Sequence, residues 1–215
     1  NQPPNYFPVN VAMNKGINKT FNDIIKSGIK PLSANEFKIL SKKATVIDCR
    51  KPQEFALSHI PNSLFIGIDG GFAPWVASVM KKLDEEVLLL VEKGREHEAV
   101  TRLARVGIDN TIGFLNGGII AWENAGYKTE MVHSIDAMQF ESEINKESNI
   151  IDVRNNGEYA NGHLMNSVFR PLDQIHQNIS EYESETNYYI HCQGGYRSMI
   201  ACSILKANGV QKITD

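Results

Sequence analysis

The chain has 215 residues, of which 42% are hydrophobic and 22% are charged, and its formal net charge at pH 7 is -3. This is an ordinary globular composition for one large or two small domains, without the basic stripe typical of nucleic-acid binding. No apolar run approaches the ~20 residues of a membrane-spanning helix, and the first residues do not resemble a signal peptide. We therefore expect a cytoplasmic protein that binds neither nucleic acid nor membranes.

The chain opens with an Asn- and Pro-rich segment of weak hydrophobic periodicity, residues 1–31. Such a segment is typical of a connector or arm and not of a domain core. Within it, residues 18–27 favour a short amphipathic helix. Because the first residue is Asn1 and not Met, we expect the chain to be a fragment or a processed piece of a longer protein.

The rest of the chain contains an internal repeat. Residues 46–66 read VIDCRKPQEFALSHIPNSLFI, and residues 150–170 read IIDVRNNGEYANGHLMNSVFR. At a constant offset of 104 residues, identical or similar side chains coincide: Asp48 and Asp152, Arg50 and Arg154, Glu54 and Glu158, Phe55 and Tyr159, His59 and His163, Asn62 and Asn166, Ser63 and Ser167. Such ungapped polar matches are rare by chance. The sequence therefore predicts two copies of one domain of about 100 residues, at 32–130 and 131–215.

Each copy contains the same succession of predicted elements. It opens with a capping-box pattern ahead of a helix, Ser33 with Glu36 and Asp136 with Gln139. A short apolar strand then ends at Asp-x-Arg, and a fully apolar strand follows later, at 87–91 and at 188–191. Short apolar strands that alternate with helices indicate parallel sheets buried on both faces. The predicted fold class is α/β, with two tandem domains that each hold a mostly parallel sheet flanked by helices.

The two copies end differently. The first closes with a strand at 111–115, a turn at 116–118 and a helix around Trp122. The second stops at Asp215, where the closing strand is expected to be running. We therefore expect the second domain to be truncated in this chain, without its last turn and helix.

The three cysteines, an odd and sparse set, argue against a disulfide framework and for a reducing compartment. Cys49 falls in a strand pattern and Cys202 on an apolar helix, so both are expected to be small buried hydrophobic residues. Cys192 instead follows the apolar strand 188–191 directly. That is the carboxyl end of a strand, where the active loops of parallel α/β sheets lie.

The loop after Cys192 has the residues that a thiolate needs. Gly194 and Gly195 allow the backbone to curl and to point N–H groups inward as an anion-binding nest. The helix expected at 198–207 adds the positive potential of its N-terminus, and Arg197 adds a full positive charge. All of these features lower the pKa of a cysteine, so Cys192 is predicted to be a reactive nucleophile.

The motif Asp-x-Arg-x-x-x-Glu-(Phe/Tyr)-x-x-x-His, followed by a strand that ends in Cys-x-x-x-x-Arg, resembles the rhodanese family of sulfurtransferases over residues 32–215. The resemblance implies that Cys192 carries sulfur as a persulfide, taken from thiosulfate or a low-molecular-weight persulfide and passed to a thiol or protein acceptor. It implies no cofactor. It also implies a substrate-binding cradle, made of Gln193, Gly194, Gly195, Tyr196, Arg197 and Ser198, and structural support residues, namely Asp152, Arg154 and His163.

Two asparagines depart from the family pattern. Family members often carry Gly where this chain has Asn62 and Asn166. Asn is the residue best able to replace Gly at a positive φ, so the departure does not threaten the fold.

The first copy departs at the key position. Glu92 is expected to fall where Cys192 does, and an acidic side chain there would oppose an anionic sulfur species. The first domain is therefore predicted to be non-catalytic. The alternative is a separate acid–base site that uses Glu92, Glu96 or His97.

The opening segment and two further stretches, 72–75 and 101–107, resemble the C-terminal part of bacterial metallo-β-lactamase-fold proteins fused to tandem rhodanese domains, which are similar to persulfide dioxygenases. The resemblance implies a metal-binding domain upstream of Asn1. The six His residues of this chain are scattered and form no His-x-His-x-Asp-His run, so we expect no metal in the chain itself.

Two other functions remain open. Cys-based phosphatases and arsenate reductases also place a thiolate in an anion cradle, but their loop is Cys-x5-Arg, whereas Arg197 stands five positions after Cys192. The shorter loop favours a single sulfur atom over phosphate. The other alternative is a non-enzymatic module for regulation or interaction.

Overall fold

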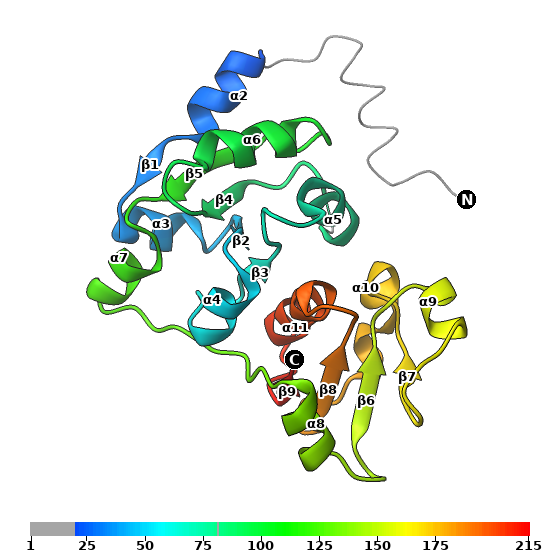
Figure 1. The fold of residues 1–215 in the computed structure, drawn as a ribbon. Coiled ribbons are helices and arrows are strands. Elements are labelled where there is room, and N and C mark those ends of the chain that lie inside the picture. The colour runs from blue at the N-terminus through cyan, green and yellow to red at the C-terminus, as the bar shows by residue number, and fades with distance from the viewer. Residues whose placement is uncertain (1–19, 81) are drawn as a thin grey trace. The chain divides into compact units, whose positions relative to one another are not determined.

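The computed structural model describes residues 20–80 and 82–215. This part of the chain forms two compact units, each with its own parallel sheet flanked by helices (Figure 1). The predicted fold class is confirmed. Residues 18 and 19 of the helix expected at 18–27, and most of the expected connector 1–31, lie outside the described residues. The rest of that helix is present as α2, Phe21–Gly28.

The first sheet has the strand order β1-β5-β4-β2-β3. Its strands are β1 Pro31–Leu32, β2 Thr45–Asp48, β3 Leu64–Phe65, β4 Val87–Leu90 and β5 Thr111–Leu115. The helices that follow α2 are α3 Ala34–Leu40, α4 Pro52–Leu57, α5 Phe72–Val79, α6 Glu96–Ala104 and α7 Gly118–Asn124. Every residue of the central strand β4 is fully buried, as the unbroken apolar run predicts.

The second sheet has the strand order β7-β6-β8-β9. Its strands are β6 Asn149–Asp152, β7 Val168–Phe169, β8 Tyr188–His191 and β9 Ile213–Thr214. Its helices are α8 Ala137–Glu143, α9 Asn156–Ala160, α10 Ile175–Asn178 and α11 Tyr196–Ala207, with short 3₁₀ turns η1 Leu172–Gln174 and η2 Ile179–Glu181. Residues 198–205 of α11 are all buried, which anchors this helix behind the loop that precedes it.

Both predicted capping boxes are confirmed. The Ser33 hydroxyl accepts from the N–H of Glu36, and the Glu36 carboxylate accepts from the N–H of Ser33 at 2.9 Å. Asp136 and Gln139 exchange the same pair of bonds at 2.9 and 3.0 Å. These local bonds satisfy N–H groups that the first turn of each helix leaves unpaired.

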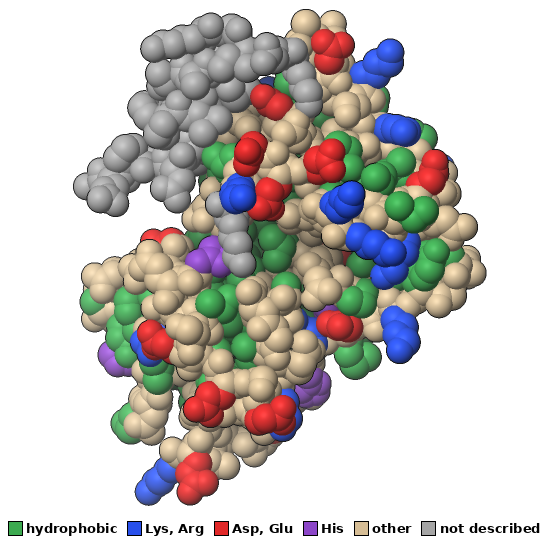
Figure 2. Space-filling view, turned by 180° about the vertical axis from the view of Figure 1, so that it is seen from behind, with side chains coloured by type: hydrophobic (Ala, Val, Ile, Leu, Met, Phe, Trp, Pro, Cys, Tyr) green, Lys and Arg blue, Asp and Glu red, His purple; other side chains and the backbone are tan. Residues whose placement is uncertain are grey.

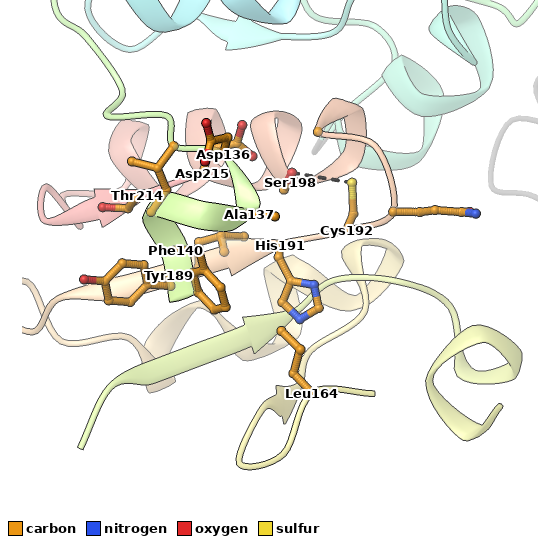
Figure 3. Close-up of a pocket in the computed structure, with 14 residues that line it drawn as sticks. Asp136, Ala137, Phe140, Leu164, Tyr189, His191, Cys192, Ser198, Thr214 and Asp215 are labelled. Carbon is orange, nitrogen blue, oxygen red and sulfur yellow. Dashed lines mark hydrogen bonds between the residues drawn. The ribbon is translucent and has the colours of Figure 1, made fainter. Parts of the chain in front are cut away.

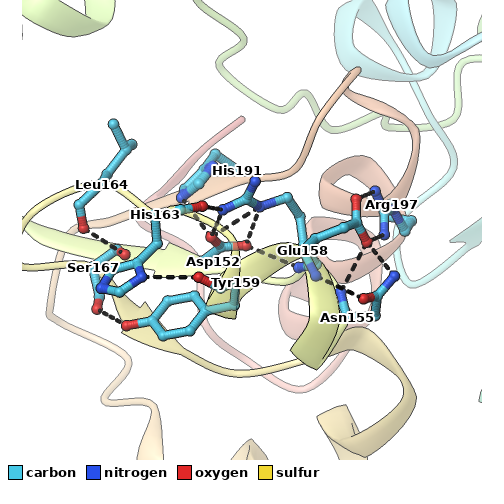
Figure 4. Close-up of polar contacts among 11 residues, drawn as sticks. Asp152, Asn155, Glu158, Tyr159, His163, Leu164, Ser167, His191 and Arg197 are labelled. Carbon is cyan, nitrogen blue, oxygen red and sulfur yellow. Dashed lines mark hydrogen bonds and ion pairs between the residues drawn. The ribbon is translucent and has the colours of Figure 1, made fainter.

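The repeated sequence motif builds the same polar framework twice. The buried Asp152 carboxylate, at the end of β6, accepts from the N–H, Nε and Nη2 of Arg154 (Figure 4). Asp48 and Arg50, at the end of β2, make the same bonds. A buried carboxylate needs such a fork of donors, because its desolvation would otherwise cost several kcal/mol.

An aromatic pair follows the Asp–Arg framework in each copy. The His163 ring stacks on Tyr159 with centroids 3.9 Å apart, and its Nδ1 donates to the Tyr159 carbonyl at 3.0 Å. His59 stacks on Phe55 at 4.0 Å and makes the same bond at 2.9 Å. The conserved spacing of the repeat therefore reflects one local geometry in both domains.

The two asparagines adopt the backbone conformation that their sequence context predicts. The φ angle is 64° at Asn62 and 67° at Asn166. Each is followed by a serine, Ser63 or Ser167, whose hydroxyl donates to the carbonyl three residues earlier and closes the turn. The expectation that asparagine replaces glycine at a positive φ is confirmed.

The visible surface carries mixed charges. On the face that Figure 2 shows, Lys and Arg side chains lie among Asp and Glu side chains. None of the described helices is long and apolar enough to cross a membrane.

The positive φ of Asn166 leads to a stability prediction. Asn166→Ala should lower the free energy of unfolding by about 1 kcal/mol, because a Cβ without a polar side chain is strained in the left-handed region. Asn166→Gly, the control, should stay close to the wild type, since glycine adopts this region freely. Urea unfolding followed by circular dichroism measures both. Equal stability of the two variants would show that the turn tolerates alanine by moving.

Candidate active site

Cys192 immediately follows β8, as predicted. The chain then turns through Gln193 and Gly194 to Gly195, which has a φ of 78° and caps α11 from the left-handed region. This turn starts the helix at Tyr196, two residues before the predicted start. Tyr196 and Arg197 therefore belong to the first helical turn, with their backbone N–H groups near the loop, because the left-handed glycine brings the chain into the helix at once.

Hydrogen-bond donors surround the Cys192 sulfur. The Ser198 hydroxyl lies 3.4 Å from Sγ (Figure 3), and the backbone N–H groups of Gly194, Arg197 and Ser198 hydrogen-bond to it. Burial of the sulfur raises the pKa of Cys192, but these donors together lower it by more. The pKa of Cys192 therefore lies below the ordinary value of a thiol, and the thiolate is more populated at neutral pH than in a free cysteine.

The other two cysteines are fully buried, as expected. Burial raises the pKa of Cys49 and of Cys202 well above the ordinary value. Among the three, Cys192 is the one with solvent exposure and a lowered pKa. A thiol reagent or sulfur donor in solution should therefore react selectively at Cys192.

Arg197 does not present an unbalanced charge to the loop. Its two terminal nitrogens donate to the Glu158 carboxylate at 2.6 and 2.7 Å (Figure 4), and its side chain also hydrogen-bonds to the Cys192 sulfur. The hydrogen bond from Arg197 lowers the pKa of Glu158 to about 2. A positively charged side chain therefore lies beside Cys192, as predicted, but an acidic residue from α9 balances its charge.

Glu158 is the residue that sequence reasoning did not include in the site. One signal was available, because Glu158 matches Glu54 in the repeat. Nothing in the local pattern, however, indicates that α9 brings this carboxylate to an arginine 39 residues further along the chain.

The three predicted support residues lie in the framework of the second domain. Burial raises the pKa of Asp152, but the hydrogen bonds from Arg154 lower it by more, so the carboxylate stays ionised. Arg154 also donates to the carbonyl of Gly162 at 2.8 Å, which joins the end of β6 to the segment that carries His163. The structure thus gives each of them contacts within the β6–β7 connection, and their role as support for the loop stays a prediction.

A cavity of about 310 Å³ opens beside Cys192 within the second domain (Figure 3). Its wall includes Phe140, Tyr189 and Leu164, together with His191 and Ser198. Its volume lies within the range of small-molecule sites in proteins.

The first-copy counterpart of Cys192 is Val91 and not Glu92. In the sheets, Asp48 pairs with Leu90 as Asp152 pairs with His191, so the residue after each strand is Val91 or Cys192. The expected match of Glu92 with Cys192 is wrong by one position, because β4 ends at Leu90, one residue before the predicted strand end. Val91 is buried and has no nucleophilic group.

The loop of the first copy has the same left-handed glycine turn as the loop of the second copy, but it lacks the nucleophile. Gly94, with a φ of 90°, matches Gly195, and Glu96 then stands where Arg197 does. The Glu96 carboxylate accepts from the Gly94 N–H at 3.0 and 2.9 Å. His97 lies against the Thr101 hydroxyl at 3.3 Å. An internal carboxylate therefore accepts a hydrogen bond from a loop N–H group in the first domain, and two of the suggested acid–base residues, Glu96 and His97, have separate local partners.

Among residues 20–80 and 82–215, no group of three or more His, Cys, Asp or Glu side chains is placed to hold a metal ion.

Comparison with known proteins shows the family. The family model described as Rhodanese-like domain matches residues 33–125 and 136–215, so this chain belongs to the rhodanese-like domain family. In Bacillus subtilis (strain 168), the chain is 31% identical over 97 residues to YrkF, a candidate sulfur carrier protein. The match covers 45% of this chain and 51% of YrkF, so the chain spans about half the length of that relative.

Two solved structures are also similar. A thiosulfate sulfurtransferase from Pseudomonas aeruginosa has 22% identity, with 87% of this chain and 43% of that chain covered and a TM-score of 0.41. A rhodanese-like domain protein from Staphylococcus aureus has 33% identity, with 39% of this chain and 82% of that chain covered and a TM-score of 0.35.

The contact between Ser198 and Cys192 yields a pH prediction. Ser198→Ala should raise the pKa of Cys192 by about one to two units, because a hydrogen bond to a charged group contributes about 1.5–3 kcal/mol and one pKa unit is about 1.4 kcal/mol. The rate of Cys192 alkylation by iodoacetamide against pH, read by intact mass, gives this midpoint.

A matched control is Ser203→Ala, which removes another buried hydroxyl of α11, one that donates to the Ile200 carbonyl at 2.7 Å. That variant should leave the midpoint unchanged. An unchanged midpoint in Ser198→Ala as well would show that the backbone donors alone set the pKa of the thiol.

Proposed function

We propose that the second domain is a sulfurtransferase that carries sulfane sulfur as a persulfide on Cys192. The observation that carries the proposal is the convergence of the Ser198 hydroxyl and three backbone N–H groups on a half-buried sulfur. Such donors stabilise a thiolate before the reaction, and the terminal sulfur of a persulfide needs the same environment after it. Membership of the rhodanese-like family and the similarity to a candidate sulfur carrier also support this function.

The reaction has two balanced steps. The Cys192 thiolate attacks the outer sulfur of the donor, an S–S bond to Cys192 forms, and the donor S–S bond breaks. Sulfite leaves if the donor is thiosulfate, and a thiolate leaves if the donor is a low-molecular-weight persulfide. An acceptor thiolate then attacks the outer sulfur of the Cys192 persulfide, and the Cys192 thiolate leaves.

The loop residues have distinct parts in this proposal. Gly194 and Gly195 shape the cradle, and Gly194 together with Arg197 and Ser198 of the first turn of α11 supplies its donors. Gln193, an exposed residue, stands at the mouth. Asp152, Arg154 and His163 keep β6 and the following segment in place.

The first domain, 32–130, is proposed as a non-catalytic partner of the second domain, 131–215. Val91 in place of a nucleophile and Glu96 on the loop backbone support this assignment. On the resemblance of segments 72–75 and 101–107, we also propose that both domains act beside an upstream metallo-β-lactamase-fold domain in a persulfide-processing protein. The gene sequence upstream of Asn1 tests that part directly.

The phosphatase alternative is disfavoured by charge. A phosphate or arsenate would need the guanidinium fork of Arg197, and the Glu158 carboxylate already accepts two hydrogen bonds from it.

Sulfur loading is the direct test. After incubation with thiosulfate or glutathione persulfide, the intact mass should rise by one sulfur atom, and cyanide should remove that sulfur as thiocyanate. Cys192→Ser should abolish the gain, whereas Cys202→Ser, at a fully buried thiol, should retain it. If Cys192 stays unmodified with every donor, the domain is a binding module and not a sulfurtransferase.

A further inference from the structure

The position of Glu158 is fixed by hydrogen bonds within its own helix. It is the third residue of α9, and its carboxylate accepts from the backbone N–H of Asn155 at 3.1 Å, while the Asn155 side chain accepts from the Glu158 N–H at 3.0 Å. This capping box holds the carboxylate in place independently of the arginine. The position of Glu158 can therefore determine the position of Arg197, which lies on a different element.

Arg197 lies between the carboxylate and the sulfur. Two of its nitrogens are held by Glu158, and the same side chain hydrogen-bonds to Cys192. Its exposed side-chain fraction is 21% and that of Glu158 is 24%, so water screens the pair only in part. At such short distances the negative charge cancels most of the field that the arginine would apply to the thiolate.

We propose that Glu158 is a positioning residue for Cys192: it holds the Arg197 guanidinium against the sulfur and balances its charge. This inference rests on the proposed function, in which Cys192 is the sulfur carrier. It predicts that the two charges of the pair act on the sulfur in opposite directions. A purely structural ion pair would instead give the same effect whichever partner was removed.

Other charged and titratable groups face this region of the second domain. They are Asp152 and His191 at the ends of β6 and β8, Arg154 after β6, Cys202 on α11 and Asp215 after β9. Asp152 pairs with Arg154, and Asp215 lies against Ser198. All of these groups are retained in the variants below.

The test is the pH profile of Cys192 alkylation in the full chain, where Cys49 and Cys202 are buried. Glu158→Gln should lower the midpoint by about half a unit to one unit, because the arginine charge is no longer balanced. Glutamine also serves in a capping box, so α9 should keep its start. Arg197→Gln should raise the midpoint, because the carboxylate is then left unbalanced near the sulfur. The double variant should return close to the wild type.

A matched control is Glu181→Gln. It removes the partner of another arginine of this domain, Arg170, and changes the net charge by the same amount. Its midpoint should equal that of the wild type. A shift as large as that of Glu158→Gln would assign the effect to net charge and overturn the proposal.

Two other outcomes would also overturn it: no shift in Glu158→Gln, or a shift in the same direction as Arg197→Gln, which would make Glu158 a simple anchor. Sulfur loading, measured by intact mass on the same samples, separates this inference from the proposed function. Opposite midpoint shifts without any loading would contradict the sulfurtransferase and leave the charge balance standing. Loading without opposite shifts would contradict only the role of Glu158.

Discussion

The convergence of hydrogen-bond donors on the half-buried Cys192 sulfur is the interaction around which the candidate site of the second domain is built. Burial alone makes the Cys192 thiol harder to ionise, and the Ser198 hydroxyl and the loop N–H groups reverse that effect. The donors must point at one atom. The end of β8 fixes the sulfur, the left-handed Gly195 turns the chain, and the buried helix α11 holds the donors of its first turn in place.

Both copies contain the same polar framework, whereas the nucleophile Cys192 belongs to the second copy. Asp48 with Arg50 and Asp152 with Arg154 make the same bonds, and Asn62 and Asn166 have nearly the same φ. These features let a short parallel strand end in a polar loop without unpaired buried charge. They are present whether or not a nucleophile follows the neighbouring strand, so the framework belongs to the fold of both copies.

Local sequence signals predicted most of the fold. The strand limits of β5 and β8 agree with the structure, as do the capping boxes of Ser33 and Asp136 and the positive φ of the two asparagines. Each depends on side-chain pattern or backbone preference within a few residues. The start of α11 was misplaced by two residues, because the conformation of Gly195 decides it and several conformations are open to glycine.

The sequence by itself determined the repeat, the parallel α/β class and the identity of Cys192 as the candidate nucleophile. Periodicity, spacing and residue type carry that information along a short stretch of chain. Only the tertiary structure decided that Val91 is the counterpart of Cys192, and that Glu158 holds Arg197. Strand register and ion pairing join segments that are distant in the chain, so their partners follow from the packed sheet and its helices and not from local pattern.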